Sequence, residues 1–255
     1  MWDGLWDHVE NWIMGEAAEL IAREFGITRA EMDAFAERSH RLAHQATEQG
    51  CFKDEIVPVE LRDRKGNVTL FERDESIRPD TSVETLAKLR PAFIEDGLVT
   101  AGNSPGLNDG AAAVVITSRE YAERKGHAPI ARVVGYGQAA VEPKWLFAAP
   151  IHAIPKALER AGWTMDDVDL VELNEAFAAQ VLADLKGLEQ NGFGIPLEKL
   201  NVHGGAIAIG HPIGASGARV LATLIHALKL RGQRRGLAAL CLGGGEAVAM
   251  AVEIE

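Results

Sequence analysis

Cysteine is scarce in the 255-residue sequence, which contains only Cys51 and Cys241. Two cysteines so far apart cannot supply the disulfide framework of a small secreted domain, and neither stands at a metal-ligand spacing. The sequence therefore predicts neither a disulfide nor a bound metal. A reducing compartment is the expected setting, and we expect the protein to be cytoplasmic.

Long apolar runs and an excess of positive charge are also missing. No run approaches the roughly 20 residues of a membrane-spanning helix, and the first ten residues are acidic rather than basic. The formal net charge of −11 argues against nucleic acid or an anionic membrane as a partner, because both need a concentrated positive field. An anionic ligand must therefore find a local basic patch.

The best local place for such a ligand lies between residues 61 and 90. Seven arginines and lysines there slightly outnumber six aspartates and glutamates. This composition suits phosphate groups, but it is equally typical of a solvated loop surface with mixed charges. From composition alone the second interpretation is the stronger.

Hydrophobic periodicity predicts an α/β protein. Thr28 and Glu31 form a capping box before a helix that continues to Gly50, and short strands flank the turn at Lys65. The apolar run 111–117 predicts a strand buried on both faces. From residue 128 the order βαβαβαββ predicts a mixed, mostly parallel five-stranded sheet with helices on both faces and an antiparallel last strand.

Glycine and small apolar residues dominate the stretch 201–219, which we interpret as the floor of an active site. Pro212 restricts the backbone of His211, so the imidazole projects from a position with few alternatives. The glycines would let a thin, apolar ligand approach the backbone closely. The alternative is a strand-to-helix turn with a purely structural histidine.

Three candidate catalytic groups follow predicted strands, where open α/β sheets bind their ligands: Asn174, His211 and Cys241. Each also has a structural explanation. Asn174 could be a helix N-cap, and Cys241 could be an inert buried thiol. Cys51 is expected to be an ordinary loop cysteine, because nothing nearby would lower its pKa.

At these residues the sequence resembles the thiolase family, in the branch of acetyl-CoA acetyltransferases and 3-ketoacyl-CoA thiolases. Three segments look like the C-terminal signatures of the family in the same order, and three others look like its coenzyme A loop region. The signature-like segments are 174–180, 201–212 and 241–245, and the loop-like segments are 89–93, 100–103 and 107–110. The resemblance implies a thiolase-like fold with an α+β loop domain.

The resemblance also implies catalytic roles. His211 would activate a nucleophilic cysteine and line one oxyanion hole with a water held by Asn174. Cys241 would exchange a proton with the α-carbon of the substrate, and the Gly243 N–H would help to form a second oxyanion hole. Coenzyme A thioesters would be substrates, with no further cofactor.

Binding roles follow from the same resemblance. Arg78 would meet the adenine end of coenzyme A, and Phe93, Ala101 and Phe177 would line the pantetheine arm. Leu146 lies near the expected acyl pocket, where Leu146-Phe147 replaces a Met-Gly pair of the family.

The family's nucleophile motif, of the type Cys-Gly-Ser-Gly, does not occur in the sequence. We therefore expect the C-terminal subunit of a split thiolase, with a loop domain at 1–98, the tail of the N-terminal domain at 99–127 and the C-terminal domain at 128–255. A partner subunit would supply the nucleophilic cysteine, in a heterotetramer with two copies of each subunit. The alternatives are a non-catalytic acyl-CoA or lipid-binding protein and an inactive remnant.

Overall fold

A four-stranded mixed sheet forms the centre of the molecule in the computed structural model, which describes residues 2–255. Its strands lie in the order β5 (Ala131–Ala140), β8 (Glu246–Ile254), β7 (Arg235–Leu242) and β6 (Leu170–Leu173). Strand β8 is antiparallel to both of its neighbours, whereas β6 and β7 are parallel. The predicted α/β class and the antiparallel last strand are confirmed.

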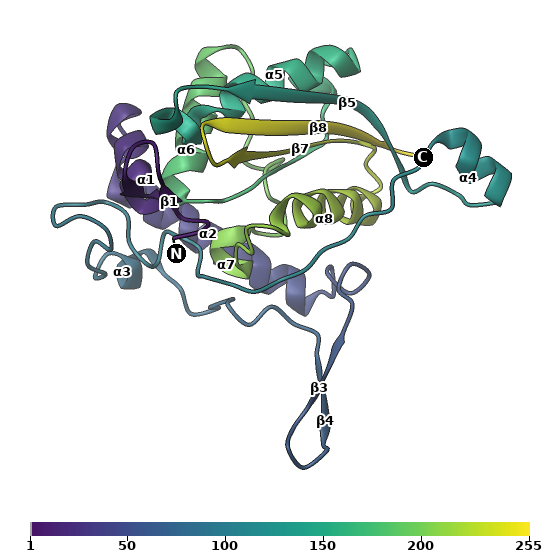
Figure 1. Cartoon of the computed structure of the whole chain (residues 1–255), viewed down its shortest axis with the longest axis horizontal. Coiled ribbons are helices and arrows are strands. Elements are labelled where there is room, and N and C mark those ends of the chain that lie inside the picture. The colour runs from purple at the N-terminus through teal and green to yellow at the C-terminus, as the bar shows by residue number, and fades with distance from the viewer. Residues whose placement is uncertain (1) are drawn as a thin grey trace.

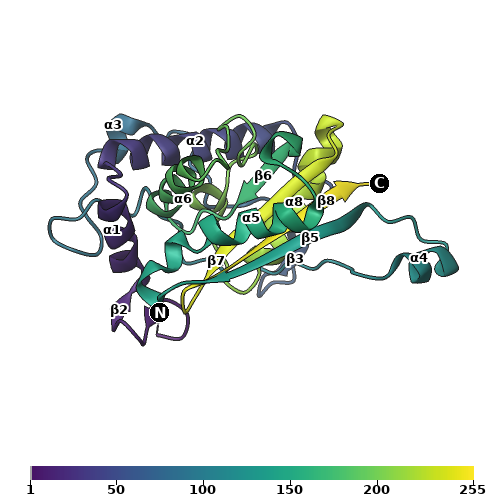
Figure 2. The same ribbon diagram turned by 90° about the horizontal axis from the view of Figure 1, so that it is seen from above.

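Helices cover both faces of this sheet (Figures 1 and 2). Helix α5 (Pro150–Ala161) packs on β5 and β8, and α8 (Ser216–Arg231) packs on the opposite face against β6 and β7. Successive residues of a strand point to opposite faces. In β8 the alanines at 247, 249 and 251 therefore join the α5 core, while Val252 and Ile254 pack on the α8 side.

The α5 face is lined with unusually small residues. A Cβ atom at Gly137 would lie 2.2 Å from the Ala153 carbonyl oxygen and 2.7 Å from the Ala157 nitrogen. A Cβ atom at Gly135 would meet the Ala157 oxygen at 2.6 Å. The two glycines thus allow the backbone of α5 to lie directly on β5.

The N-terminal helices pack against the end of this unit that carries α6 (Ala178–Gln190) and α7 (Ala206–Ile209). Thr28 and Glu31 cap α2 reciprocally, as predicted. Figures 1 and 2 show α1 and α2 side by side with α6. The remaining elements are β1 (Trp6–Asp7), β2 (Trp12–Ile13), α1 (Met14–Glu24), α2 (Arg29–Glu48), β3 (Val59–Arg62), β4 (Val68–Phe71), α3 (Val83–Leu86), α4 (Arg119–Lys125), and the 3₁₀ helices η1 (Pro143–Ala148) and η2 (Met165–Asp167).

The sheet has one strand fewer than expected and a single parallel pair. The missing fifth strand is the segment before Gly204, whose backbone pairs with β6 only at a bridge between Val171 and Leu200. The segment turns away at Asn201, whose φ is 43°. The Asn201 side chain then takes over the pairing, because its Oδ1 accepts from the Leu173 N–H and its Nδ2 donates to the Leu173 carbonyl, both at 2.9 Å.

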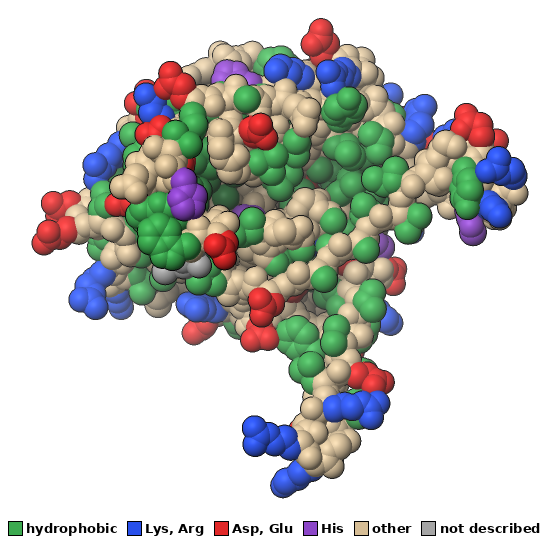
Figure 3. Space-filling model, viewed as in Figure 1, with side chains coloured by type: hydrophobic (Ala, Val, Ile, Leu, Met, Phe, Trp, Pro, Cys, Tyr) green, Lys and Arg blue, Asp and Glu red, His purple; other side chains and the backbone are tan. Residues whose placement is uncertain are grey.

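The predicted buried strand at 111–117 is not observed. The segment is extended but unpaired within residues 2–255, and all of its side chains are exposed, with Val115 98% accessible. The β3–β4 hairpin projects from the body, and Lys and Arg side chains gather near its tip (Figures 1 and 3). None of the helices in residues 2–255 combines the length and the hydrophobicity that a membrane span requires.

The close approach of α5 to β5 yields a stability prediction. Gly137→Ala should lower the free energy of unfolding by about 1–3 kcal/mol, because its Cβ would overlap backbone atoms that cannot move independently. Urea unfolding measures this change. Gly194→Ala is the matched control, since its Cβ would have no neighbour closer than 3.8 Å. Equal unfolding midpoints for the two variants would contradict the packing argument.

Candidate active site

His211 lies in the turn between α7 and α8, and its backbone is held from three sides. The residue before it, Gly210, has a φ of 102°, a value that L side chains rarely adopt. Asn108 Oδ1 accepts a hydrogen bond from the His211 N–H at 3.3 Å, and its Nδ2 donates to Ser76 Oγ at 3.0 Å. Pro212 follows directly, so few backbone conformations are open to His211.

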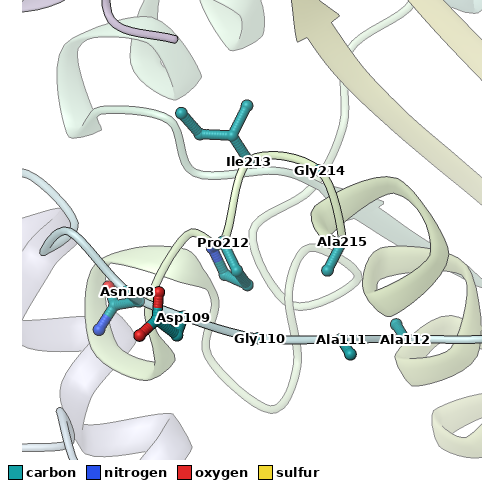
Figure 4. Close-up of a pocket in the computed structure, with 9 residues that line it drawn as sticks. All are labelled: Asn108, Asp109, Gly110, Ala111, Ala112, Pro212, Ile213, Gly214 and Ala215. Carbon is teal, nitrogen blue, oxygen red and sulfur yellow. The ribbon is translucent and has the colours of Figure 1, made fainter. Parts of the chain in front are cut away.

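A pocket of about 430 Å³ lies beside this turn. Figure 4 shows the extended segment 108–112 running past the loop 212–215, with the Asp109 carboxylate and the Pro212 ring between them. Gly110 makes this crossing possible, because a Cβ there would lie 2.6 Å from Pro212 Cγ. The pocket therefore opens next to the catalytic candidate, between segments that are distant in the sequence.

Both ring nitrogens of His211 have hydrogen-bonding partners. Nδ1 lies 2.6 Å from Ser216 Oγ, and Nε2 lies 3.3 Å from Asn174 Nδ2. Ser216 Oγ donates its single proton to the Pro212 carbonyl at 3.0 Å. The hydroxyl must then accept from the ring, so Nδ1 carries the proton of the neutral imidazole and Nε2 carries the lone pair.

The surroundings keep this imidazole neutral. Burial and, to a smaller extent, the positive charge of Arg219 together lower the pKa of His211 to about 4. At neutral pH the ring is therefore a free base, with its lone pair on the nitrogen that faces Asn174. This is the state that a proton acceptor needs.

Asn174 is not a helix cap, which removes its structural explanation. Helix α6 begins at Ala178, and Phe177 occupies the N-cap position. The Asn174 backbone N–H instead donates to the Ala239 carbonyl at 2.9 Å, so the residue continues the line of β6 beyond its last paired position. Its side chain is therefore free to contact His211.

Cys241 lies at the same edge of the sheet as Asn174. Strands β6 and β7 are parallel and Ala239 bonds to the Asn174 backbone, so Cys241, two residues further along β7, lies near that edge. Burial raises the pKa of the Cys241 thiol, and the nearby Asp184 carboxyl raises it further. Cys241 is thus a protonated thiol at neutral pH. Gly243 lies in the exposed turn between β7 and β8.

Three of the glycines in the 201–219 stretch do not admit a ligand, contrary to the prediction. A Cβ at Gly205 would lie 2.3 Å from the Glu175 carboxyl carbon, one at Gly204 would lie 2.4 Å from the Ser39 carbonyl oxygen, and one at Gly210 would meet Asn108. Atoms of Glu175, Ser39 and Asn108 fill the space beside these three glycines. Only Gly214 and Gly217 have room for other atoms.

Glu175 is the buried anchor of this region. Its carboxylate accepts from Ser39 Oγ at 2.6 Å, from Asn201 Nδ2 at 2.9 Å and from the Ile207 N–H at 3.1 Å. Burial raises the pKa of Glu175, and these three donors oppose that shift. The carboxylate therefore ties α2, the end of β6 and α7 together directly behind the His211 turn.

The residues expected around pantetheine separate into two groups. Phe93 and Phe177 meet edge to face with ring centroids 6.1 Å apart, and Phe147 also meets Phe177 edge to face, with centroids 5.4 Å apart. Leu146 belongs to the same core and is only 2% exposed. Ala101, in contrast, is exposed and lines a pocket of about 470 Å³ formed with the segment 89–95.

Arg78 lies between β4 and α3, where His40 holds its backbone. The Arg78 N–H donates to His40 Nδ1 at 3.1 Å, and the Arg78 side chain is exposed. Cys51 lies after α2, with its Sγ 4.0 Å from Gln49 Oε1. Throughout residues 2–255, no group of three or more His, Cys, Asp or Glu side chains is arranged to hold a metal ion.

Comparison with known proteins identifies the family. Residues 127–254 match the sequence model of the thiolase C-terminal domain, and residues 1–120 match that of the thiolase N-terminal domain. The chain belongs to the thiolase family. Among curated relatives, the acetyl-CoA acetyltransferase of Allochromatium vinosum is 51% identical over 98% of this chain, and that of Syntrophomonas wolfei is 52% identical over 99%.

Solved structures agree with this assignment and confirm the predicted thiolase-like fold. The Bacillus anthracis acetyl-CoA acetyltransferase superposes with a TM-score of 0.94 at 48% identity, and human mitochondrial 3-ketoacyl-CoA thiolase with 0.93 at 40%. Each match covers 98% of this chain and 62% of the other chain. The chain likewise spans 62 to 63% of the length of the two curated relatives.

The expectation of a split thiolase is wrong. We expected the C-terminal subunit, with only the tail of the first domain at 99–127, and a separate subunit that would supply the nucleophilic cysteine in a heterotetramer. Instead, residues 1–120 of this same chain match the thiolase N-terminal domain, and the relatives that it matches are ordinary acetyl-CoA acetyltransferases. A separate N-terminal-domain subunit is therefore not indicated. The boundaries at 98 and 127 stay predictions.

Ser216 and Asn108 were missed as site residues. Ser216 follows His211 by five residues at the start of α8, and its place in the glycine-rich stretch was a usable signal. Asn108 lies in a segment that resembled the coenzyme A loop region. Nothing in the sequence shows that its side chain bonds to the His211 backbone.

The environment of His211 predicts how its ring titrates. The folded-state pKa lies near 4, below the ordinary 6.5, so the neutral base should persist as pH falls to about 5 and be lost only as pH falls through about 4. Imidazole ¹⁵N chemical shifts, followed from neutral pH to well below the expected midpoint, measure that midpoint. A midpoint near 6.5 would contradict the burial argument.

Proposed function

We propose that the chain serves in acyl transfer between coenzyme A thioesters, a reversible Claisen exchange in which a thiol cleaves a 3-ketoacyl-CoA. Relatives named acetyl-CoA acetyltransferase and 3-ketoacyl-CoA thiolase support the reaction class. The observation that carries the proposal is the neutral His211 imidazole with its Nε2 lone pair 3.3 Å from the Asn174 amide. Coenzyme A thioesters are the substrates, and the proposed chemistry uses no other cofactor.

His211 begins the cleavage as a general base. Its Nε2 takes the proton of the attacking thiol while the sulfur bonds to the 3-keto carbon, and the Gly243 N–H stabilises the resulting alkoxide. Collapse of the alkoxide breaks the bond between C2 and C3, and the electron pair leaves as the enolate of acetyl-CoA. The imidazolium N–H and the Asn174 amide N–H then donate to the enolate oxygen.

Cys241 completes the cycle as the proton donor to the α-carbon. The environment that raises its pKa keeps the thiol protonated, so a proton is available when the enolate forms. The thiolate left behind recovers a proton from the His211 imidazolium, which returns both groups to their starting states. In the condensation direction the same thiolate removes the α-proton of acetyl-CoA.

The same residues are proposed to bind an extended coenzyme A. Ala101 and the 470 Å³ pocket beside it would receive the pantetheine arm, and Phe93 and Phe177, which contact each other outside the lining of that pocket, would line the arm further along. Arg78 offers an exposed guanidinium to the adenine end. Leu146 is buried, so it would set the depth of the acyl pocket rather than its rim.

Thiolysis of acetoacetyl-CoA by the active protein tests the proposal. His211→Ala and Cys241→Ala should each lower kcat by roughly a hundredfold or more, the effect of losing a general acid–base group. Cys51→Ser is the matched thiol control and should leave kcat unchanged.

Exchange of the acetyl-CoA α-protons for deuterium, followed by mass spectrometry, separates the two roles. Cys241→Ala should abolish this exchange, because Cys241 is the group assigned to the α-carbon. Wild-type kcat in His211→Ala, or unchanged exchange in Cys241→Ala, would contradict the assigned chemistry.

A further inference from the structure

Arg219 is a partly buried arginine beside the site, and the proposed chemistry leaves it without a role. It lies in the first turn of α8, three residues after Ser216, so both side chains face the same side of the helix. Its Nη2 donates to Asn174 Oδ1 at 3.4 Å, and its Nη1 lies 3.6 Å from Glu172 Oε2. The second contact is too long to be a hydrogen bond, and burial raises the pKa of Glu172 to about 8, so most of this carboxyl is neutral at pH 7.

The orientation of the Asn174 amide depends on its hydrogen bond with Arg219. An asparagine side chain can present either its oxygen or its NH₂ group to a given neighbour. The Arg219 guanidinium has only donors, so the Asn174 oxygen must face it. The NH₂ group then faces His211 Nε2 and donates to the lone pair there.

The residues at the two ends of this hydrogen-bond chain, Ser216 and Arg219, therefore require the same tautomer of His211. From one end, the Ser216 hydroxyl accepts from Nδ1–H because its own proton goes to the Pro212 carbonyl. From the other end, Arg219 acts through Asn174 to require an acceptor at Nε2. One helix turn thus specifies the same imidazole tautomer twice, with Ser216 in direct contact and Arg219 through Asn174.

We infer that Arg219 is a positioning residue that fixes the Asn174 amide and, through it, the tautomer of His211 with a free Nε2. Without the guanidinium, the amide can turn over and present its oxygen to Nε2, which favours the tautomer protonated at that nitrogen. A ring in that tautomer cannot accept a proton at Nε2. Glu172, 2% exposed, supports Arg219 from the end of β6.

Imidazole ¹⁵N spectra at pH 7 test the inference directly. Wild type should show His211 protonated at Nδ1 alone, whereas Arg219→Met, which keeps the side-chain length but has no donor, should show a mixture of tautomers. Arg219→Lys keeps a group that only donates, so it should restore the Nδ1–H form. Glu172→Gln is the matched control, since it keeps the guanidinium and should retain the wild-type tautomer.

The catalytic consequence rests on the proposed function, whereas the tautomer does not. Arg219→Met should lower kcat for thiolysis by roughly ten- to hundredfold with little change in KM, because misorientation of a catalytic group affects the chemical step rather than binding. Shifted spectra with unchanged kcat would support the positioning role and contradict the function assigned to His211.

The fold of each variant is checked by urea unfolding. If Arg219→Met alone does not fold, the Glu172→Gln/Arg219→Met double variant removes the buried carboxyl that would otherwise lose its partner, and its spectrum replaces that of the single variant. A pure Nδ1–H tautomer in the folded Arg219→Met protein, or in the double variant, would overturn the inference. So would a shift in Glu172→Gln as large as that in Arg219→Met.

Discussion

The hydrogen bond between Asn174 Nδ2 and His211 Nε2 is the interaction on which the functional interpretation depends. It joins the end of a sheet strand to a turn between two helices, so it forms only if the whole unit is folded correctly. A neutral imidazole in this setting accepts a proton, and the imidazolium that results can donate to an oxyanion. One residue therefore meets both demands of the proposed thioester chemistry without moving.

The buried polar groups behind the site explain how the turn stays in place. Glu175 would destabilise the fold if it were buried alone, but three donors from α2, α7 and Asn201 satisfy it. Each hydrogen bond to a charged group contributes about 1.5–3 kcal/mol. These hydrogen bonds hold the segments behind the His211 turn in place.

Much of the fold could be predicted because its helices and strands carry strong local patterns. The α2 capping box and the alternation in β8 are examples, and both gave nearly correct boundaries. The absence of the expected fifth strand could not be predicted, because the Asn201 side chain replaces backbone pairing there. The prediction of a buried strand at 111–117 failed because an apolar pattern shows only that a segment can be buried. It does not show which residues will cover the segment.

The candidate site was predicted as a set of residues but not as an arrangement. Asn174 and His211 meet as expected, although the strand predicted before His211 is absent and the residue lies between two helices. The glycines between 204 and 210 instead make room for Glu175, Ser39 and Asn108. Contacts over more than a hundred residues of sequence, such as that of Asn108 with His211, leave no periodic signal.

A crystal structure of the active protein with a bound acyl-CoA tests the central claim most directly. The account predicts that the thioester carbonyl oxygen lies within hydrogen-bonding distance of His211 Nε2 and Asn174 Nδ2, with the α-carbon next to Cys241 Sγ and the pantetheine arm running past Ala101. An acyl-CoA bound elsewhere on the chain, with no atom near His211, would contradict it.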